Sequence, residues 1–167
     1  GMFNFTGEVK IHIEILTSTS EIVLHYKLLD VTAINLLNPI NSQLERPLLP
    51  FSNLSTHEFL VIDLGSVKNQ GDEILLQIMY KGELRDDNDG FYYGTYVDVN
   101  SATVYYAATQ FEIDEARHSM PCYDEPGIRA PIKLSISHNP RYYAAANMPV
   151  LSSDVSATNP AYNTTVF

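Results

Sequence analysis

Residues 8–15 read EVKIHIEI, and apolar side chains alternate with polar or charged ones throughout this stretch. A period of two is typical of a β-strand buried on one face, because successive side chains of an extended chain point to opposite sides. We therefore expect Val9, Ile11, Ile13 and Ile15 to face a hydrophobic core.

Segments of the same kind follow at short spacing, and no segment of roughly 11 or more residues shows a sustained helical period. The expected strands are residues 22–28, 31–37, 59–64, 73–84, 104–112, 132–137 and 142–146. Residues 38–55 are predicted to form a loop because three prolines interrupt them, and Gly65 is predicted to end the strand before it. Residues 114–129 are predicted to be rich in turns, with one helical turn. This spacing predicts an all-β fold, a sandwich-like or saddle-shaped pair of mostly antiparallel sheets.

The chain has 167 residues, of which 45% are hydrophobic and 18% charged, a composition typical of a single globular domain. Gly1 and Met2 are interpreted as a cloning remnant, so the domain is expected to comprise residues 3–167. Twenty acidic residues against ten Lys and Arg give a net charge of −10, which disfavours nucleic acid and anionic membrane surfaces as partners. The single cysteine excludes an internal disulfide framework, and no apolar run approaches the roughly 20 residues of a membrane-spanning helix.

Two short motifs resemble metal sites but lack the required ligands. His57 and Glu58 begin like the zinc-binding pattern H-E-x-x-H, but Val61 stands where the second histidine is needed. The acidic residues 86–90 lack the acids that a calcium loop needs at its first and last positions. We therefore predict no metal site in this chain and a solvated turn at residues 86–90.

Nucleophilic and acid–base catalysis are also weakly supported. Cys122 lies four residues after His118, which could in principle activate it, but we favour a buried thiol packed under a loop. Asp124 and Glu125 are adjacent, so in an extended chain they point to opposite faces and are poorly placed for paired catalysis. One of them is expected to bind Arg117 or a backbone amide, and no catalytic residue is predicted.

Residues 105–112 read YYAATQFE. In the strand expected at 104–112, a period of two puts Gln110 and Glu112 on one face, while Phe111 on the other face can anchor the strand in the core. A carboxylate beside an amide is a suitable receptor for a ligand ammonium group, through charge-assisted hydrogen bonds. The alternative interpretation is an ordinary polar sheet face.

Several strings in this order are familiar: TQFE at 109–112, AR at 116–117, PCYDEP at 121–126 and NMP at 147–149. Together with F-x-G-x-V at 5–9 and Y-x-G-x-L at 80–84, they resemble the amino-terminal domain of aminopeptidase N-type zinc metallopeptidases, the gluzincin aminopeptidases. The resemblance covers nearly the whole chain, and the particular residues of these motifs are most similar to those of the insect midgut members.

The resemblance implies a role for two residues. In these enzymes the glutamate of the TQFE string, here Glu112, helps to bind the free α-ammonium group of the peptide. The glutamine, here Gln110, lines the pocket for the first side chain. The zinc ion and the H-E-x-x-H motif belong to a following catalytic domain of the same chain, which is absent here. The resemblance therefore implies a fragment that is inactive alone, whose parent enzyme removes N-terminal residues from peptides.

The family continues with further strands of this domain beyond residues 164–167. We therefore expect the domain to be truncated at its C-terminal end, with an open strand edge through which it self-associates. A second hypothesis is a recognition module, a surface receptor or a carbohydrate-binding domain without a catalytic role. An exposed aromatic platform formed by seven tyrosines would favour this second hypothesis. We expect instead that at least half of them are buried or packed under loops. These are Tyr92, Tyr93, Tyr96, Tyr105, Tyr106, Tyr142 and Tyr143.

Three sequons, at Asn4, Asn53 and Asn163, are possible N-glycosylation sites and a mild indication of secretion. With the resemblance, they favour the extracellular face of the plasma membrane, with the anchor outside this chain. A cytoplasmic relative is the alternative.

Overall fold

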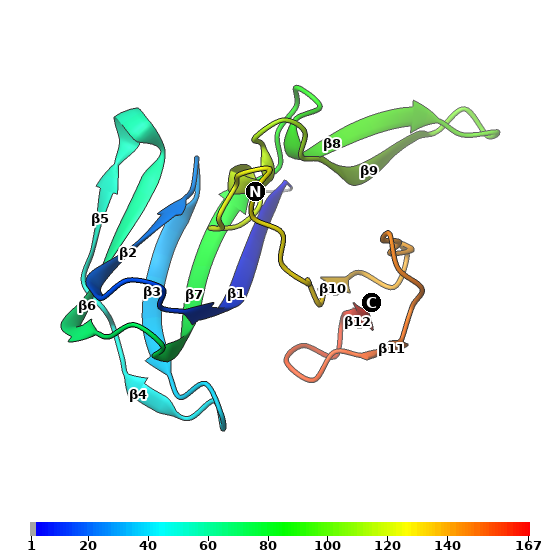
Figure 1. Ribbon diagram of the computed structural model, residues 1–167. Coiled ribbons are helices and arrows are strands. Elements are labelled where there is room, and N and C mark those ends of the chain that lie inside the picture. The colour runs from blue at the N-terminus through cyan, green and yellow to red at the C-terminus, as the bar shows by residue number, and fades with distance from the viewer. Residues whose placement is uncertain (1–2) are drawn as a thin grey trace. The chain divides into compact units, whose positions relative to one another are not determined.

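The computed structural model describes residues 3–167, in which twelve β-strands and two short 3-10 turns account for all of the regular structure (Figure 1). The chain divides into two compact units, Gly1–Ile128 and Arg129–Phe167. All pairings between strands are antiparallel. The predicted all-β class is therefore confirmed.

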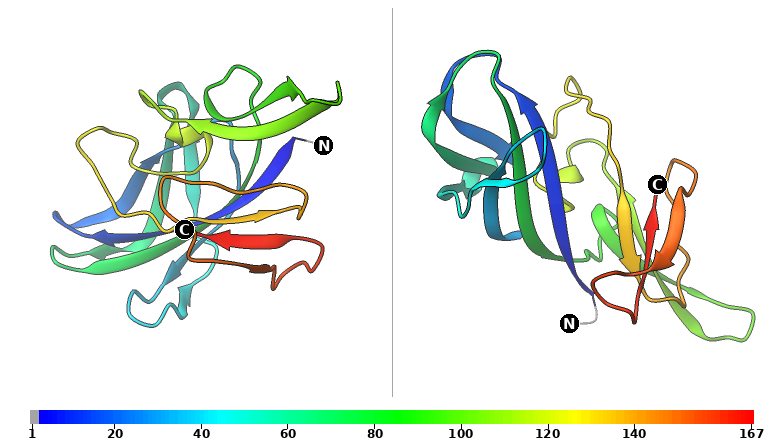
Figure 2. Two further views of the ribbon diagram at one scale, coloured as in Figure 1. Left: turned by 90° about the vertical axis from the view of Figure 1, so that its right-hand side faces the viewer. Right: turned by 90° about the horizontal axis from the view of Figure 1, so that it is seen from below.

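The larger unit contains a four-stranded sheet in the order β1-β7-β3-β4. Its strands are β1 (Asn4–Glu14), β7 (Glu73–Glu83), β3 (Asp30–Leu37) and β4 (Leu44–Arg46). Strands β1 and β7 pair along their whole length, and Figure 2 shows them as long neighbouring strands. The alternation that opens the sequence is reproduced, because odd-numbered residues of β1 are half-buried and even-numbered ones are exposed.

A three-stranded sheet of the same unit has the order β2-β6-β5. Its strands are β2 (Thr19–His25), β6 (Phe59–Lys68) and β5 (Phe51–Leu54), and the 3-10 turn η1 (Ser55–His57) connects β5 to β6. Side chains of both sheets form one core, in which Leu24, Leu60, Ile62, Leu76 and Ile78 are almost completely buried. Burial of each such side chain contributes roughly 1.5–3 kcal/mol, so this core is what fixes the two sheets face to face.

Three expectations for the first half of the chain are wrong. Residues 38–55 are not only a loop, since they contain the edge strands β4 and β5, and the prolines fall outside both strands. Gly65 does not end a strand: it lies inside β6 with φ of +70°, and the pairing with β2 jumps there from Asp63 to Lys68. Gly65 therefore forms a bulge, for which a positive φ is suited. Leu28 is exposed with φ of 54°, because β2 already ends at His25.

The two-stranded sheet of this unit is the hairpin β8 (Gly90–Val97) and β9 (Thr103–Gln110). Its register pairs Gly90 with Gln110 and Val97 with Thr103. The carboxylate of Asp98 shapes the hairpin turn, because it accepts hydrogen bonds from the backbone N–H groups of Asn100 and Ala102. After β9 come turns and the 3-10 turn η2 (Ala116–His118), which confirms the single helical turn predicted for residues 114–129.

The smaller unit has one three-stranded sheet in the order β10-β12-β11. Its strands are β10 (Ser135–His138), β11 (Ser152–Val155) and β12 (Asn163–Val166). The strand expected at 132–137 is thus shorter and shifted, and the one expected at 142–146 is absent from this described stretch. Strands β11 and β12 escaped prediction because they are short, and three of the four residues of β12 are polar.

Candidate functional site

Gln110 and Glu112 lie at the end of the β8–β9 hairpin and at the start of the turn that follows it. Gln110 is the last residue of β9, whereas Glu112 already belongs to the turn. The backbone N–H of Glu115 donates to the carbonyl oxygen of Phe111 at 3.1 Å, so the chain is no longer extended there. The period-two argument that placed Gln110 and Glu112 on one strand face is therefore wrong beyond Gln110. Phe111 is 36% exposed and is not the expected core anchor.

The 3-10 turn η2 packs against the rung of the hairpin that carries Gln110. Residues opposite each other in an antiparallel pair project to the same face, and Gln110 is opposite Gly90. A Cβ atom at Gly90 would lie 2.7 Å from Cβ of His118 and 3.3 Å from the carbonyl oxygen of Glu115. Gly90 also has φ of 64°. A glycine is therefore required here for both backbone conformation and space, and it lets η2 lie beside Gln110.

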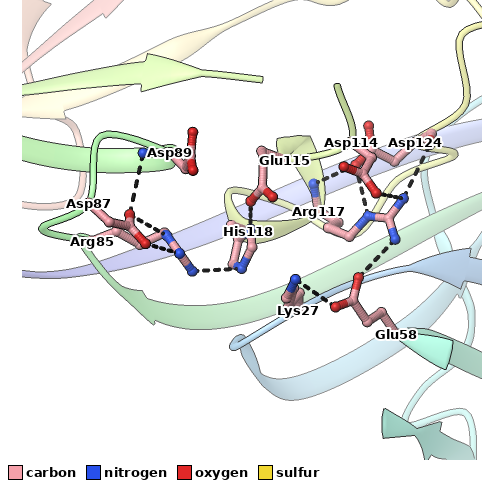
Figure 3. A network of polar contacts seen from close by, with 10 residues as sticks. All are labelled: Lys27, Glu58, Arg85, Asp87, Asp89, Asp114, Glu115, Arg117, His118 and Asp124. Carbon is pink, nitrogen blue, oxygen red and sulfur yellow. Dashed lines mark hydrogen bonds and ion pairs between the residues drawn. The ribbon is translucent and has the colours of Figure 1, made fainter. Parts of the chain in front are cut away.

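A buried guanidinium group ties the segment after Glu112 to the β2-β6-β5 sheet (Figure 3). Arg117 is only 8% exposed, and its Nε and backbone N–H both donate to Oδ2 of Asp124, at 3.0 and 3.1 Å. Its Nη1 donates to Oε2 of Glu58 at 2.9 Å, and the other carboxylate oxygen of Glu58 lies 2.6 Å from Nζ of Lys27. The prediction that an acid of this loop binds Arg117 or a backbone amide is confirmed for Asp124, which does both.

In this cluster the cations Arg117 and Lys27 are paired with the carboxylates of Asp124 and Glu58. The hydrogen bond from Lys27, together with that from Arg117, lowers the pKa of Glu58 despite partial burial. Backbone hydrogen bonds reinforce the arrangement: His25 and Cys122 exchange both of theirs, and the N–H of Lys27 donates to the carbonyl oxygen of Arg117 at 3.0 Å. Side-chain and backbone contacts thus hold residues 117–124 against the end of β2.

A second set of contacts joins η2 to the acidic turn before β8 (Figure 3). Arg85 forms a bidentate pair with Asp87, and its Nη1 lies 2.8 Å from Nε2 of His118. Since a guanidinium group can only donate, Nε2 of His118 accepts, and the imidazole proton resides on Nδ1. That atom lies 2.5 Å from Oε2 of Glu115, although the contact lacks the angular geometry of a hydrogen bond. The turn at residues 86–90 thus has a structural role.

Electrostatics agree with a neutral imidazole at this position. His118 is 4% exposed, and burial together with the charge of Arg85 lowers its pKa, while Glu115 opposes the shift. Sequence reasoning considered His118 only as a partner of Cys122. Its true partner Arg85 is 33 residues away along the chain, and only the sheet topology brings them together.

Cys122 is half-buried, where the sequence predicted a buried thiol. Burial, with a further contribution from the charge of Asp124, raises the pKa of Cys122 to about 12. A thiol with this pKa is almost entirely protonated at neutral pH and is a poor nucleophile. The side chain of His118 is engaged with Arg85 and Glu115 and offers no base to Cys122.

The expectation for the tyrosines is wrong in part. Of the seven named above, Tyr92 and Tyr93 are half-buried, and Tyr93 stacks on Phe3 with ring centroids 3.9 Å apart. The other five are exposed, so fewer than half are buried; they are Tyr96, Tyr105, Tyr106, Tyr142 and Tyr143. On the hairpin, Tyr92 and Tyr106 lie on the same face as Gln110, and their rings meet edge-on at 6.5 Å. The hairpin therefore presents an aromatic face that leads to Gln110.

Within residues 3–167, no group of three or more His, Cys, Asp or Glu side chains is arranged to hold a metal ion. The zinc-like pair is used otherwise, because Glu58 binds Arg117 and Lys27, and the ring of His57 stacks near Phe59. The resemblance implies the zinc ion in a following catalytic domain, so these described residues are not expected to be its ligands. The described residues also include no helix of the length and apolar character needed to cross a membrane.

Fold and site together define an all-β domain that presents an amide and a carboxylate at the end of a braced hairpin. The chain matches the family of the peptidase M1 N-terminal domain over residues 2–167, and it belongs to this family. The resemblance to aminopeptidase N-type peptidases is confirmed.

Three relatives illustrate the match. Endoplasmic reticulum aminopeptidase 1 of Rattus norvegicus is 30% identical over 149 residues, covering 89% of this chain and 16% of the relative. Aminopeptidase N of Oryctolagus cuniculus is 29% identical over 171 residues, covering 100% of this chain and 18% of the relative. Aminopeptidase M1-A of Oryza sativa subsp. japonica is 31% identical over 153 residues, covering 91% of this chain and 17% of the relative. This chain thus spans less than a fifth of the length of these relatives.

The raised pKa of Cys122 predicts slow alkylation of the native chain. At pH 8 the thiolate fraction of a group with a pKa near 12 is about a thousandfold smaller than that of an ordinary cysteine. Mass spectrometry after iodoacetamide treatment should therefore show little labelling of the folded chain and rapid labelling in urea. Equal labelling rates in the two conditions would contradict this account of the thiol.

Proposed function

We propose that this chain is the substrate-anchoring amino-terminal domain of a zinc aminopeptidase, which removes N-terminal residues from peptides. In this proposal Glu112 binds the free α-ammonium group of the substrate, and Gln110 lines the pocket for the first side chain. The supporting observation is that both exposed groups lie at the end of the β8–β9 hairpin, in a chain of the peptidase M1 N-terminal family.

The carboxylate of Glu112 is suited to this role because the neighbouring acids already contact other side chains. Asp114 lies 3.7 Å from Arg117, and Glu115 faces His118. Among the residues that the structure describes, no such ion pair engages Glu112, which is exposed. An ammonium group that meets this carboxylate is bound by charge-assisted hydrogen bonds.

The catalytic step belongs to the following domain of the parent protein in this proposal. Zinc, when bound there, supplies an activated water and polarises the scissile carbonyl group. This chain's residues bind and orient the peptide N-terminus and take no part in bond cleavage, so the chain alone hydrolyses nothing. Its partners are peptide N-termini and the catalytic domain of the same chain.

A recognition module remains the second candidate function, and the exposed tyrosines favour it. Tyr96, Tyr105 and Tyr106 give the hairpin exposed aromatic surface, which suits a carbohydrate ring or a protein ligand. In this alternative the domain is a surface receptor without a catalytic role. The two functions are separated by the effect of Glu112 on peptide turnover.

Replacement of Glu112 by alanine in the full-length enzyme should lower kcat/KM for peptide substrates by about 10- to 100-fold, since a hydrogen bond to a charged group contributes about 1.5–3 kcal/mol. Steady-state kinetics with an amino-acid p-nitroanilide measure the effect. Glu125→Ala, at an exposed acid of the neighbouring loop, is the matched control and should leave kcat/KM within about twofold. An unchanged kcat/KM in Glu112→Ala would remove the anchoring role and leave the recognition module.

We also propose that the parent is a glycoprotein on the extracellular face of the plasma membrane, a cytoplasmic location being the alternative. The three sequons differ in accessibility. Asn4 and Asn53 are exposed, whereas Asn163 is half-buried in the central strand β12. The named relatives come from two mammals and a plant, so the likeness to insect midgut members stays a prediction.

Protein secreted from eukaryotic cells should carry glycans at Asn53 and Asn4 and little at Asn163. Glycosidase release in water enriched in oxygen-18, which labels each deglycosylated site as Asp, followed by peptide mass mapping, reports occupancy at each site. A chain without any glycan at the three sites would count against the extracellular assignment.

Self-association through open strand edges is a further part of the proposal. Edge strands present unpaired backbone groups, and β11 is an edge of its sheet with exposed Val155 and Leu151 beside it. Sedimentation velocity on the 167-residue chain should show a dimer fraction that grows with concentration. A strictly monomeric profile at high concentration would contradict this part.

A further inference from the structure

His118 contacts both elements that carry the proposed substrate-binding residues. Its Cβ atom fills the space above Gly90, on the rung whose other member is Gln110. It also ends η2, which directly follows the turn that contains Glu112 and that is closed by the hydrogen bond from the N–H of Glu115 to the carbonyl oxygen of Phe111. No other titratable side chain of the described residues packs against Gly90 so closely. The position of His118 therefore sets where the Glu112 turn lies relative to Gln110.

The imidazole is held in one protonation state by its partners. Nε2 accepts a hydrogen bond from Arg85, whose guanidinium is fixed in turn by Asp87. The proton on Nδ1 faces the carboxylate of Glu115. This arrangement needs the lone pair of Nε2, and only the neutral imidazole has it.

The charged groups around His118 come from three parts of the chain. The turn before β8 supplies Arg85, backed by the acids Asp87 and Asp89, the segment after β2 supplies Lys27, and the η2 segment itself supplies Glu115. Two cations and one carboxylate thus act directly on the ring. A second proton would remove the acceptor for Arg85 and place a positive charge against the guanidinium group.

We propose that neutral His118 is a positioning residue for the substrate anchor, and that its protonation releases η2 from the hairpin and weakens binding of the peptide N-terminus. The inference rests on the proposed function of Glu112 and Gln110. Protonation takes one proton from solvent and breaks the hydrogen bond from Arg85 to Nε2. The turn that carries Glu112 then loses its support on the Gly90 rung, while the zinc chemistry of the parent enzyme is untouched. The effect is therefore on KM.

Burial and Arg85 lower the pKa of His118, so the neutral form is fully present above the ordinary histidine value of about 6.5 and is lost as the pH falls through the lowered value. The stabilising contribution of neutral His118 to the folded state follows the same sign: it is complete above the unfolded-state pKa and decreases on acidification.

The test compares the wild-type full-length enzyme with His118→Gln between pH 7.5 and 5.0, using an amino-acid p-nitroanilide. Glutamine offers an oxygen to Arg85 but does not titrate. We expect KM of the wild type to rise relative to that of His118→Gln once the pH falls through the lowered pKa of His118, by up to about tenfold for each pH unit below it, because each such unit removes about nine-tenths of the neutral form. The change in kcat should be the same in both. His12→Gln, at an exposed histidine on β1, is the matched control and should keep the wild-type profile.

Superimposable KM profiles of wild type and His118→Gln would overturn the inference. Its failure is distinct from failure of the proposed function, because Glu112→Ala is assayed at pH 7.5 in the same series. If His118→Gln does not fold, amide hydrogen exchange of residues 111–119 in the wild-type chain decides. Protection that falls as His118 titrates supports the inference, and protection that stays constant through that titration overturns it.

Discussion

The buried guanidinium group of Arg117 is the interaction on which the rest of the site depends. A cation with 8% exposure is tolerated only when it is paired and hydrogen-bonded. Its partners Asp124 and Glu58 come from different segments, one seven residues and the other 59 residues away along the chain. Because Arg117 contacts both carboxylates at once, the loop after the hairpin is fixed in one position against the β2-β6-β5 sheet.

Some of the acidic residues that make the net charge negative therefore have a structural role inside the domain. Glu58, Asp87, Glu115 and Asp124 each neutralise or orient a basic side chain of the network (Figure 3). The bracing matters because a two-stranded hairpin is at best marginally stable alone. With η2 packed over Gly90 and fixed to the sheet, the end of the hairpin becomes a defined place from which an amide and a carboxylate project.

The sequence predicts well what depends on local pattern and poorly what depends on topology. Strands β1 and β7 bury whole faces, so their alternation was visible, and the pairing of Arg117 with Asp124 was within reach because the residues are close along the chain. Gly65 lies within β6 and not at its end, because a glycine with positive φ suits a bulge as well as a strand end. The contact of His118 with Arg85 had no sequence signal, because it exists only once β7 and β8 bring the acidic turn over η2.

The central claim is that the Arg117 cluster acts on substrate binding through the position of Glu112. A double-mutant cycle on kcat/KM with Asp124→Asn and Glu112→Ala tests it most directly, since Asp124→Asn removes the charge of the pair but keeps an amide oxygen that can accept from Arg117. The account predicts that Asp124→Asn lowers kcat/KM in the wild type but hardly at all when Glu112 is already alanine, a coupling of about 0.5–3 kcal/mol. Additive losses from the two substitutions would contradict it.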